Sequence, residues 1–299
     1  MSELDDAKRK AASGVEAVRE DLIRTSLAIH DDNELGFKEF QSSERVAKLL
    51  AGAGFRVDKP AYGLETAFRA EWGEGPLTLA YFCEYDALPQ IGHACGHNLI
   101  ATCGAGGAIG LKAALNPAQV RIIVFGSPAE EGGSGKVKMI NAGCLEGVDV
   151  ALMAHPSAVD IDMPTMFGVA RLDVEYRGKS AHASASPETG VNALDAFMIG
   201  YQAVAALRQH IRRDARIHGI ITEGGAAPNI VPEYTAGRFY VRALNPGYLE
   251  ELKERVLNCF NAGALATGAE LSYVWADDSC DPVRNNKVLA GVYRENAEA

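Results

Sequence analysis

The sequence lacks the features that mark membrane and secreted proteins. It contains no run of about twenty apolar residues, the length that a transmembrane helix needs. Its polar start, MSELDDAKRKAASG, has no apolar core of a secretion signal. Its six cysteines are spread along the chain without the spacing of a disulfide framework. These absences predict a cytoplasmic protein that does not bind membranes.

A basic surface for nucleic acid is also missing. The formal net charge is −10, and the densest basic clusters, RKAA near the start and RQHIRR at 208–213, fit solvated helix faces. Nucleic-acid binding needs a concentrated positive footprint, so we expect no such partner. The G-x-S-x-G elbow is absent as well, which argues against a serine hydrolase.

The composition that is present suits a large α/β chain. The 299 residues are enough for two domains or one large domain, and 47% of them are hydrophobic, so a sizeable core can be buried. The 31 glycines and the 7% aromatic content fit a chain with many tight turns.

The first half of the sequence alternates buried strands with helices. Apolar runs at 76–82, 121–126 and 148–154 are typical of buried strands, and 65–72 alternates like a half-buried strand. The expected helices cover residues 15–30, 42–54, 99–115 and 134–142. Such alternation predicts a mostly parallel sheet with helices on both faces, which is a three-layer αβα domain.

The pattern changes near residue 165. Strand and helix patterns then follow in the order β-α-β-β-α-β up to residue 276, which predicts a ferredoxin-like α+β sandwich. We therefore expect a first domain over 1–165, an inserted domain over 166–280, and a return into the first domain over 281–299.

Side chains that can bind metals or move protons follow the predicted strands of the first domain. They are Asp86, His93, Cys95, His97, Glu130, Glu131 and His155. Because the carboxyl ends of parallel strands form the ligand crevice of an open sheet, these side chains should gather at one edge. A mixed set of thiol, imidazole and carboxylate ligands suits a catalytic metal site better than a closed structural zinc site.

The adjacent pair Glu130 and Glu131 is informative in itself. Neighbouring side chains point in different directions, so one can bind a metal while the other faces bound water. That arrangement supplies a ligand and a general base, which metal-assisted hydrolysis requires.

Other interpretations of the same residues stay open. Cys95 could be a small buried hydrophobic residue, or a thiol nucleophile activated by neighbouring histidines. His97 could be a hydrogen-bonded core residue, and His93 has no assigned role. The segment GAGGAIG at 104–110 resembles a dinucleotide loop, but it lies inside a helix pattern, where close helix packing explains it.

The ordered motifs CEYDALP, GHACGHN, SPAEEGG, AHP, GKSAHAS and GGAAPNIVPE resemble those of the zinc-peptidase-like amidohydrolases. This family includes aminoacylases, indole-acetyl-amino-acid hydrolases and p-aminobenzoyl-glutamate hydrolase. The resemblance runs from about residue 20 to residue 299. It implies a catalytic domain with two metal ions, interrupted by a smaller lid or dimerisation domain.

The resemblance also implies roles for individual residues of the first domain. The metal ligands would be Cys95, which would bridge the two ions, and His97, Glu131 and His155. Glu130 would be the general base, and Asp86 would orient a ligating histidine. The thiolate favours zinc, with manganese and cobalt as alternatives.

The lid would contribute three further residues by the same resemblance. His182 would polarise the scissile carbonyl in the partner subunit's site of a homodimer formed through 166–280, and Asn229 would bind substrate. Arg242 would hold a substrate carboxylate, although a solvated strand charge explains it equally well.

The resemblance implies a metal-dependent amidohydrolase acting on N-acyl amino acids or dipeptides. Family members continue for roughly another hundred residues and supply a final histidine ligand there, whereas no histidine follows His218 in this sequence. We therefore expect either a truncated chain or an incompletely held second metal. The alternative is a protein of the same fold that binds without catalysing, or a non-catalytic subunit.

Overall fold

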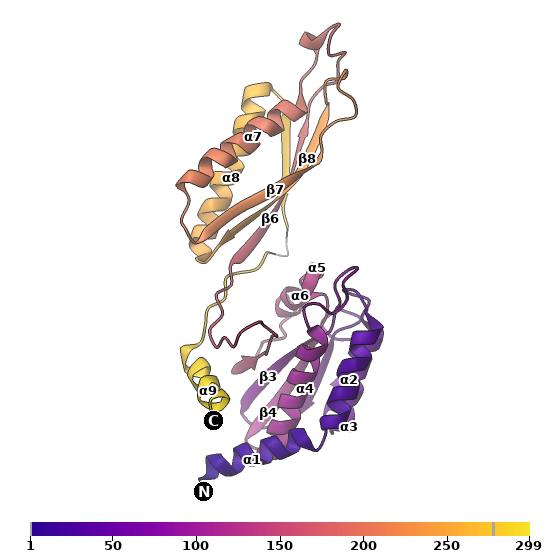
Figure 1. The fold of residues 1–299 in the computed structure, drawn as a ribbon, viewed down its shortest axis with the longest axis vertical. Coiled ribbons are helices and arrows are strands. Elements are labelled where there is room, and N and C mark those ends of the chain that lie inside the picture. Colours follow the sequence, from indigo (N-terminus) through magenta and orange to yellow (C-terminus); the bar gives the residue numbers. More distant parts are fainter. Residues whose placement is uncertain (1, 277–278) are drawn as a thin grey trace. The chain divides into compact units, whose positions relative to one another are not determined.

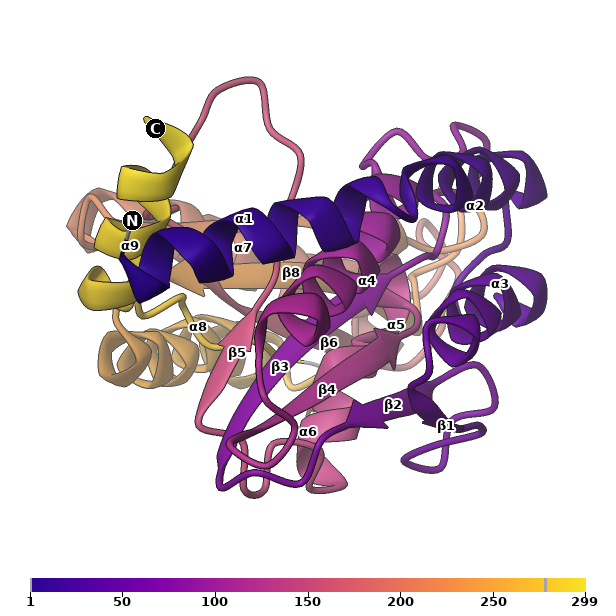
Figure 2. The ribbon, with the colours of Figure 1, turned by 90° about the horizontal axis from the view of Figure 1, so that it is seen from below.

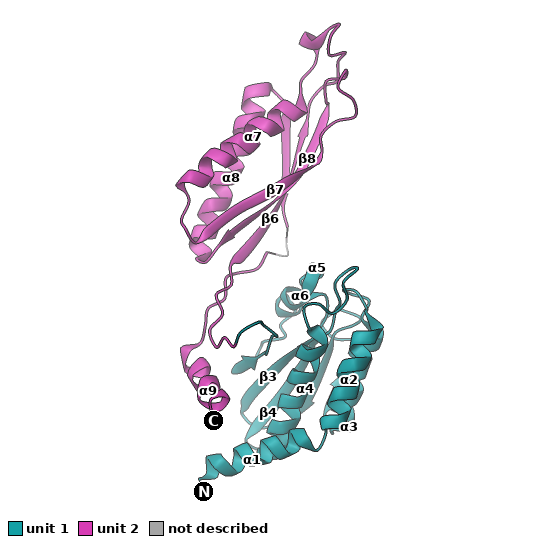
Figure 3. Ribbon diagram, viewed as in Figure 1, with its two compact units in different colours: residues 1–159 teal, residues 160–299 magenta. Residues whose placement is uncertain are grey.

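The structure, a computed structural model, describes residues 2–276 and 279–299. The chain forms two compact units, residues 1–159 (unit 1) and 160–299 (unit 2), shown in Figure 3. The domain limits expected from the sequence stay predictions. Among the described residues, no helix combines the length and apolar character needed to cross a membrane.

Unit 1 is built on a five-stranded sheet with the strand order β1-β2-β4-β3-β5. The strands are β1 (Arg56–Asp58), β2 (Phe68–Trp72), β3 (Leu77–Glu84), β4 (Val120–Ser127) and β5 (Val150–Leu152). β3 pairs in parallel with both β4 and β5, whereas β2 runs antiparallel to β1 and β4. Only β2 is therefore reversed among these strands, and the expected mostly parallel sheet is confirmed.

Helices cover both faces of this sheet. They are α1 (Glu3–Glu16), α2 (Arg19–Asp32), α3 (Phe40–Gly52), α4 (His97–Ala114), α5 (Glu130–Gly133) and α6 (Gly135–Asn141). Alternate residues of β3 point to opposite faces, so Cys83 packs toward α4 while Phe82 packs with Met139 of α6. α1 lies along α4 on the outer side, as Figure 2 shows.

Small residues let α4 approach the sheet closely. A Cβ atom on Gly104 would lie 2.7 Å from the Cys83 sulfur and 2.9 Å from the Phe82 carbonyl oxygen. Both contacts are shorter than van der Waals distance, so only glycine fits at this position. The glycines of 104–110 thus serve helix packing, and they do not form a dinucleotide loop.

Unit 2 contains the ferredoxin-like sandwich (Figure 1). Its elements are β6 (Gly168–Arg177), η1 (Pro187–Thr189), α7 (Ala193–Leu207), η2 (Arg208–His210), β7 (Ala215–Glu223), β8 (Tyr234–Ala243), α8 (Pro246–Thr267), β9 (Glu270–Trp275) and α9 (Lys287–Ala297). The antiparallel sheet has the order β7-β8-β6-β9. Its core joins sheet and helices through Phe197, Phe239 and Phe260, whose ring centroids lie 5.0 to 6.2 Å apart.

Two expectations for unit 1 were wrong in detail. The helix expected over 15–30 is α2, which covers Arg19–Asp32, and α1 precedes it as a separate helix that was not expected. α1 is mostly polar and buries none of its residues, and its start is marked by the capping box of Ser2 and Asp5. The strand expected over 148–154 is paired only over Val150–Leu152.

Candidate metal centre

The predicted metal-binding side chains of unit 1 do converge beyond the carboxyl ends of its strands. β3 is followed by Asp86, β4 by the Glu130–Glu131 pair and β5 by His155, while His97 opens α4. Two groups of side chains have ligand atoms within 4.8 Å of one another. They are Cys95, His97 and His155, and His97, Glu130 and Glu131. Both groups could hold a metal ion, and they share His97.

A buried carboxylate fixes the orientation of His97. The His97 Nδ1 lies 2.9 Å from Asp86 Oδ1, and both side chains are almost completely buried. Because a carboxylate accepts hydrogen bonds, Nδ1 carries the proton and Nε2 keeps its lone pair. Nε2 has no hydrogen-bond partner among the described residues and lies 3.9 Å from Glu130 Oε2 and from Glu131 Oε1. A buried nitrogen left unpaired and aimed at carboxylates is suited to bind a cation.

Asp86 also holds the segment that carries the two glutamates. Its second oxygen, Oδ2, accepts a hydrogen bond from the Glu131 backbone N–H at 3.0 Å. Burial alone would raise the pKa of Asp86, but the hydrogen bonds from His97 and Glu131 outweigh it and the pKa lies below its ordinary value. Asp86 therefore stays ionised and links His97 of α4 to the start of α5.

Cys95 and His155 face each other on the exposed side of the group. The Cys95 sulfur lies 3.3 Å from His155 Nε2, and His155 Nδ1 donates to the Pro156 carbonyl oxygen at 2.8 Å. Nε2 of His155 is thus the nitrogen with the free lone pair. Gly96 brings the two loops together, because a Cβ atom there would lie 2.9 Å from Pro156 Cγ.

The electrostatics of this region favour a bound cation. Burial first, and then the neighbouring Glu131, raise the pKa of Cys95 to about 12, so the thiol stays protonated unless a cation stabilises the thiolate. Burial and the charge of Glu131 also raise the pKa of Glu130. For His97, burial lowers the pKa, but Asp86 and the two glutamates raise it above its ordinary value. These shifts reflect burial together with crowded negative charge, and they argue against Cys95 as an unaided nucleophile.

A fourth carboxylate, Glu84, was not singled out from the sequence. It ends β3, is almost fully buried, and places Oε2 3.6 Å from His97 Nε2. Its Oε1 is paired with Lys136, the second residue of α6. Glu84 and Asp86 are two residues apart at a strand end, which was the available sequence signal. His93 lies outside both groups, buried with its ring 6.1 Å from that of His30.

In unit 2, the structure brings together His182 and Asn229 but not Arg242. His182 pairs with Ile230 across a β-bridge, and the Asn229 carbonyl accepts from the Ala183 N–H at 3.0 Å. Arg242 lies near the far end of β8, eight residues beyond its first residue, Tyr234. At about 3.3 Å per residue, Arg242 lies roughly 26 Å from Tyr234.

The backbone sets the tautomer of His182. Its Nδ1 accepts hydrogen bonds from the N–H groups of Ser184 at 3.3 Å and Ala185 at 3.2 Å. A nitrogen that accepts carries no proton, so Nε2 bears the N–H of the neutral ring. His182 is therefore preset as a hydrogen-bond donor through Nε2.

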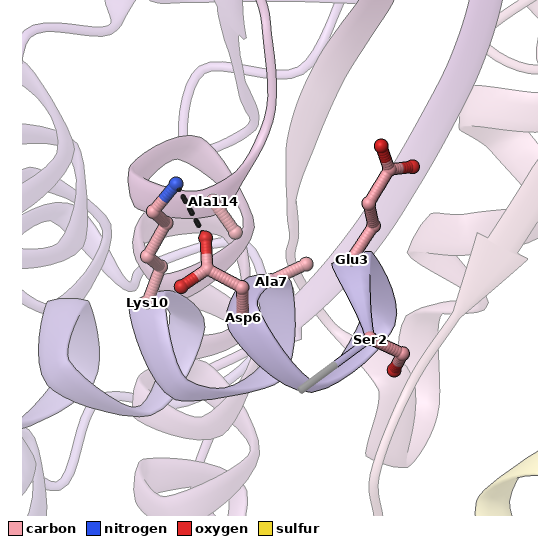
Figure 4. Close-up of a pocket in the computed structure, with 6 residues that line it drawn as sticks. All are labelled: Ser2, Glu3, Asp6, Ala7, Lys10 and Ala114. Carbon is pink, nitrogen blue, oxygen red and sulfur yellow. Dashed lines mark ion pairs between the residues drawn. The ribbon is translucent and has the colours of Figure 1, made fainter.

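A separate surface hollow lies at the opposite end of α4 and has different chemistry. It is lined by Ser2, Glu3, Asp6, Ala7, Lys10 and Ala114 (Figure 4). Figure 4 shows Lys10 paired with Asp6, 2.8 Å apart. Ala114 and His97 bound α4, and at 1.5 Å per residue they lie roughly 25 Å apart. This hollow has no cysteine or histidine in its lining, so it is not a candidate for the metal centre.

Comparisons with known proteins place these features in a family context. Residues 165–267 match the family described as "Peptidase dimerisation domain". The chain is 41% identical over 312 residues to the Xaa-Arg dipeptidase of Mus musculus, covering 99% of this chain and 72% of that protein. It is 33% identical over 299 residues to a p-aminobenzoyl-glutamate hydrolase chain of Escherichia coli (strain K12), covering 92% and 61%.

Solved structures share the fold at lower sequence identity. The aminobenzoyl-glutamate utilization protein of Klebsiella pneumoniae matches with a TM-score of 0.78 and 20% identity, over 97% of this chain and 83% of that one. A dinuclear metal-binding peptidase of the M20 family from Bacillus subtilis matches with a TM-score of 0.72 and 20% identity, over 95% and 80%.

Proposed function

This chain belongs to the M20 peptidase family and is a hydrolase of C–N amide bonds, and we propose that the strand-end cluster of unit 1 is its catalytic metal centre. The family resemblance drawn from the ordered motifs is confirmed. The observation that carries the proposal is the unpaired, buried Nε2 of His97, which lies within 3.9 Å of two carboxylate oxygens.

The proposed ligands are Cys95, His97, Glu131 and His155, which together offer a thiolate, two imidazoles and a carboxylate. This mixture suits zinc, and the carboxylates permit a second ion about 3.5–4 Å from the first. When bound, the ions would supply Lewis acidity toward the scissile carbonyl and lower the pKa of water.

Glu130 is the proposed general base. It adjoins Glu131 in the chain, but its own side chain is 41% exposed and is therefore open to water and substrate. Burial and the neighbouring Glu131 raise the pKa of Glu130. A general base works best when its pKa lies near the pH at which the enzyme operates, and the shift is in that direction. Glu130 would take a proton from water as the carbonyl is attacked and pass it to the leaving amine.

His182 is the proposed donor to the oxyanion that develops on the carbonyl. Its Nε2–H is set by the backbone amides of Ser184 and Ala185, so no reorganisation is needed when charge develops. Asn229 lies beside it and would contact substrate. A substrate group held by these two residues cannot also reach Arg242 of the same chain, which weakens the assignment of Arg242 as a carboxylate anchor.

We further propose a dipeptide or N-acyl amino acid as substrate. The relative named for its action on Xaa-Arg dipeptides is 41% identical to this chain, so a dipeptide with a carboxy-terminal arginine is the first substrate to test. The match of residues 165–267 to a dimerisation domain supports a homodimer through unit 2. A cytoplasmic location stays a prediction.

The deciding experiment compares the wild-type chain with Glu130→Gln. Both proteins are assayed against a panel of Xaa-Arg dipeptides and N-acyl amino acids, and their metal content is measured. We expect the variant to retain its metal and to lose about 100- to 10,000-fold in kcat, the usual contribution of a general base. Hydrolysis by the variant at the wild-type rate would contradict the proposal. Metal binding without turnover by either protein would favour the non-catalytic alternative.

A further inference from the structure

Glu39 is a fully buried carboxylate that the proposed mechanism does not use. It stands immediately before α3, and its side chain is 0% exposed. A carboxylate is seldom buried so completely unless its oxygens are paired. Its partners therefore indicate what it does.

Both oxygens of Glu39 accept short hydrogen bonds from distant segments. Oε1 accepts from the backbone N–H of Ala129 at 2.8 Å, and Oε2 accepts from the Thr66 hydroxyl at 2.8 Å. Ala129 is 90 residues away in the chain and directly precedes Glu130. Glu39 thus ties the start of α3 to the first residue of the segment that carries the proposed base.

Ala129 has a backbone conformation that alanine adopts only when its surroundings hold it. Its φ of 53° and ψ of 49° lie in the left-handed region, which disfavours residues that carry a Cβ. Gly36 packs against it, since a Cβ atom there would lie 2.9 Å from the Ala129 Cβ. The hydrogen bond that the Ala129 N–H donates to Glu39 and the contact with Gly36 together hold this turn.

The amides on either side of Glu130 are held by different buried carboxylates. The Ala129 N–H donates to Glu39, and the Glu131 N–H donates to Asp86 at 3.0 Å. Asp86 also orients His97, whereas the hydrogen bonds of Glu39 go to Ala129 and Thr66, neither of which is a proposed ligand. The direction in which Glu130 and Glu131 leave the backbone therefore depends on two carboxylates at once.

We propose that Glu39 is a positioning residue for Glu130 and Glu131. By fixing the left-handed turn at Ala129, it directs one glutamate toward the metal ligands and leaves the other open to water. This inference rests on the proposed function, because it gives Glu130 and Glu131 the roles assigned there.

The test uses the full chain with Glu39→Ala, Glu39→Gln and Gly36→Ala, and with Val46→Ala as the matched control. Val46 is a fully buried residue of α3 that takes no part in these hydrogen bonds, so its truncation destabilises the same helix by leaving a cavity. The readouts are kcat and KM separately, zinc affinity by competition with a chelator, and the thermal unfolding midpoint.

We expect Glu39→Ala to lower kcat at least about 10-fold with little change in KM, and to weaken zinc binding about 10-fold, the lower end of the range for residues that support a metal ligand. Glu39→Gln should keep kcat and zinc affinity near their wild-type values, because its amide oxygen can accept from the Ala129 N–H and its amide nitrogen can donate to the Thr66 hydroxyl. Gly36→Ala should also lower kcat, and it decides the matter if Glu39→Ala does not fold. Val46→Ala should keep wild-type kcat and zinc affinity while losing stability.

The inference is overturned if Glu39→Ala folds and keeps wild-type kcat and zinc affinity, or if Val46→Ala loses both to the same extent. A folded Glu39→Gln that fails to recover, or a Gly36→Ala with wild-type kcat, would also overturn it. If no variant, including wild type, hydrolyses an amide, the proposed function fails by itself. In that case zinc affinity alone decides whether Glu39 positions Glu131.

Discussion

The two units hold the histidines proposed to act at the active site in different ways. In unit 1, His97 is oriented by the buried carboxylate of Asp86, and the same carboxylate holds the Glu131 backbone. In unit 2, His182 is oriented by the backbone amides of Ser184 and Ala185 from its own loop. Unit 1 therefore depends on single side chains far away in sequence, whereas unit 2 depends on the local conformation of the chain.

The difference suits the chemistry proposed for each histidine. A metal ligand needs a basic lone pair, and a carboxylate on the opposite nitrogen provides it by fixing the tautomer and raising basicity. An oxyanion donor needs a fixed N–H, and two backbone amides on the opposite nitrogen provide it without adding negative charge. Single substitutions should therefore affect different quantities in the two units, namely kcat in unit 2 and zinc affinity in unit 1.

Among the tests of this comparison, the largest expected effect comes from removing the proposed donor of unit 2. His182→Ala should lower kcat about 100- to 1,000-fold, the usual cost of losing one oxyanion donor, and should leave the metal content unchanged. Ser184→Ala is the matched control. It removes the hydroxyl, which lies 3.3 Å from His182 Nδ1, but keeps the two amides that hold Nδ1, so its kcat should stay within about twofold of wild type. Loss of metal in His182→Ala would show that His182 also supports metal binding, which contradicts the separate roles proposed for the two histidines.

The next largest effect comes from removing the carboxylate of unit 1. Asp86→Ala leaves His97 Nδ1 and the Glu131 N–H without their acceptor. Zinc affinity, measured against a competing chelator, should fall about 10- to 100-fold. Zinc affinity equal to that of wild type would show that His97 does not need Asp86 to bind metal.

The smallest effect concerns the pH dependence of stability. Burial, as the largest cause, raises the pKa of Glu39 above its ordinary value of 4.5 in the folded chain. A raised folded pKa means that the stability contributed by the protonated group is lost as pH rises from about 4.5 through that pKa. As pH rises over this interval, the thermal unfolding midpoint of metal-free Glu39→Gln should therefore fall less than that of the metal-free wild-type chain. Parallel curves for the two proteins would contradict the direction of the shift.

Most of the fold could be predicted because its signals are local. The apolar run at 76–82 and the alternation at 65–72 each identify a strand without reference to the rest of the chain, and they correspond to β3 and β2. α1 was not predicted because its sequence is mostly polar and none of its residues is buried. The capping box of Ser2 and Asp5 is the local signal that marks its start.

The site could be predicted only where a motif or a strand end pointed to it. Asp86, His97 and Glu131 follow predicted strands, and the sheet itself implies that they meet. Glu39 and Ala129 are 90 residues apart, and nothing local to either indicates that they are hydrogen-bonded. Glu84 was overlooked because its residue type is also common on solvated strand ends, and only the fold shows that it is buried beside His97.

The most direct test of the metal centre is zinc K-edge X-ray absorption on the zinc-loaded wild-type chain and on Cys95→Ser. If Cys95 is a ligand beside His97, Glu131 and His155, the wild-type spectrum contains a sulfur neighbour at about 2.3 Å from zinc together with nitrogen and oxygen neighbours, and the variant loses the sulfur. A tightly bound zinc with no sulfur neighbour in the wild-type chain, or a sulfur that persists in Cys95→Ser, would contradict the account.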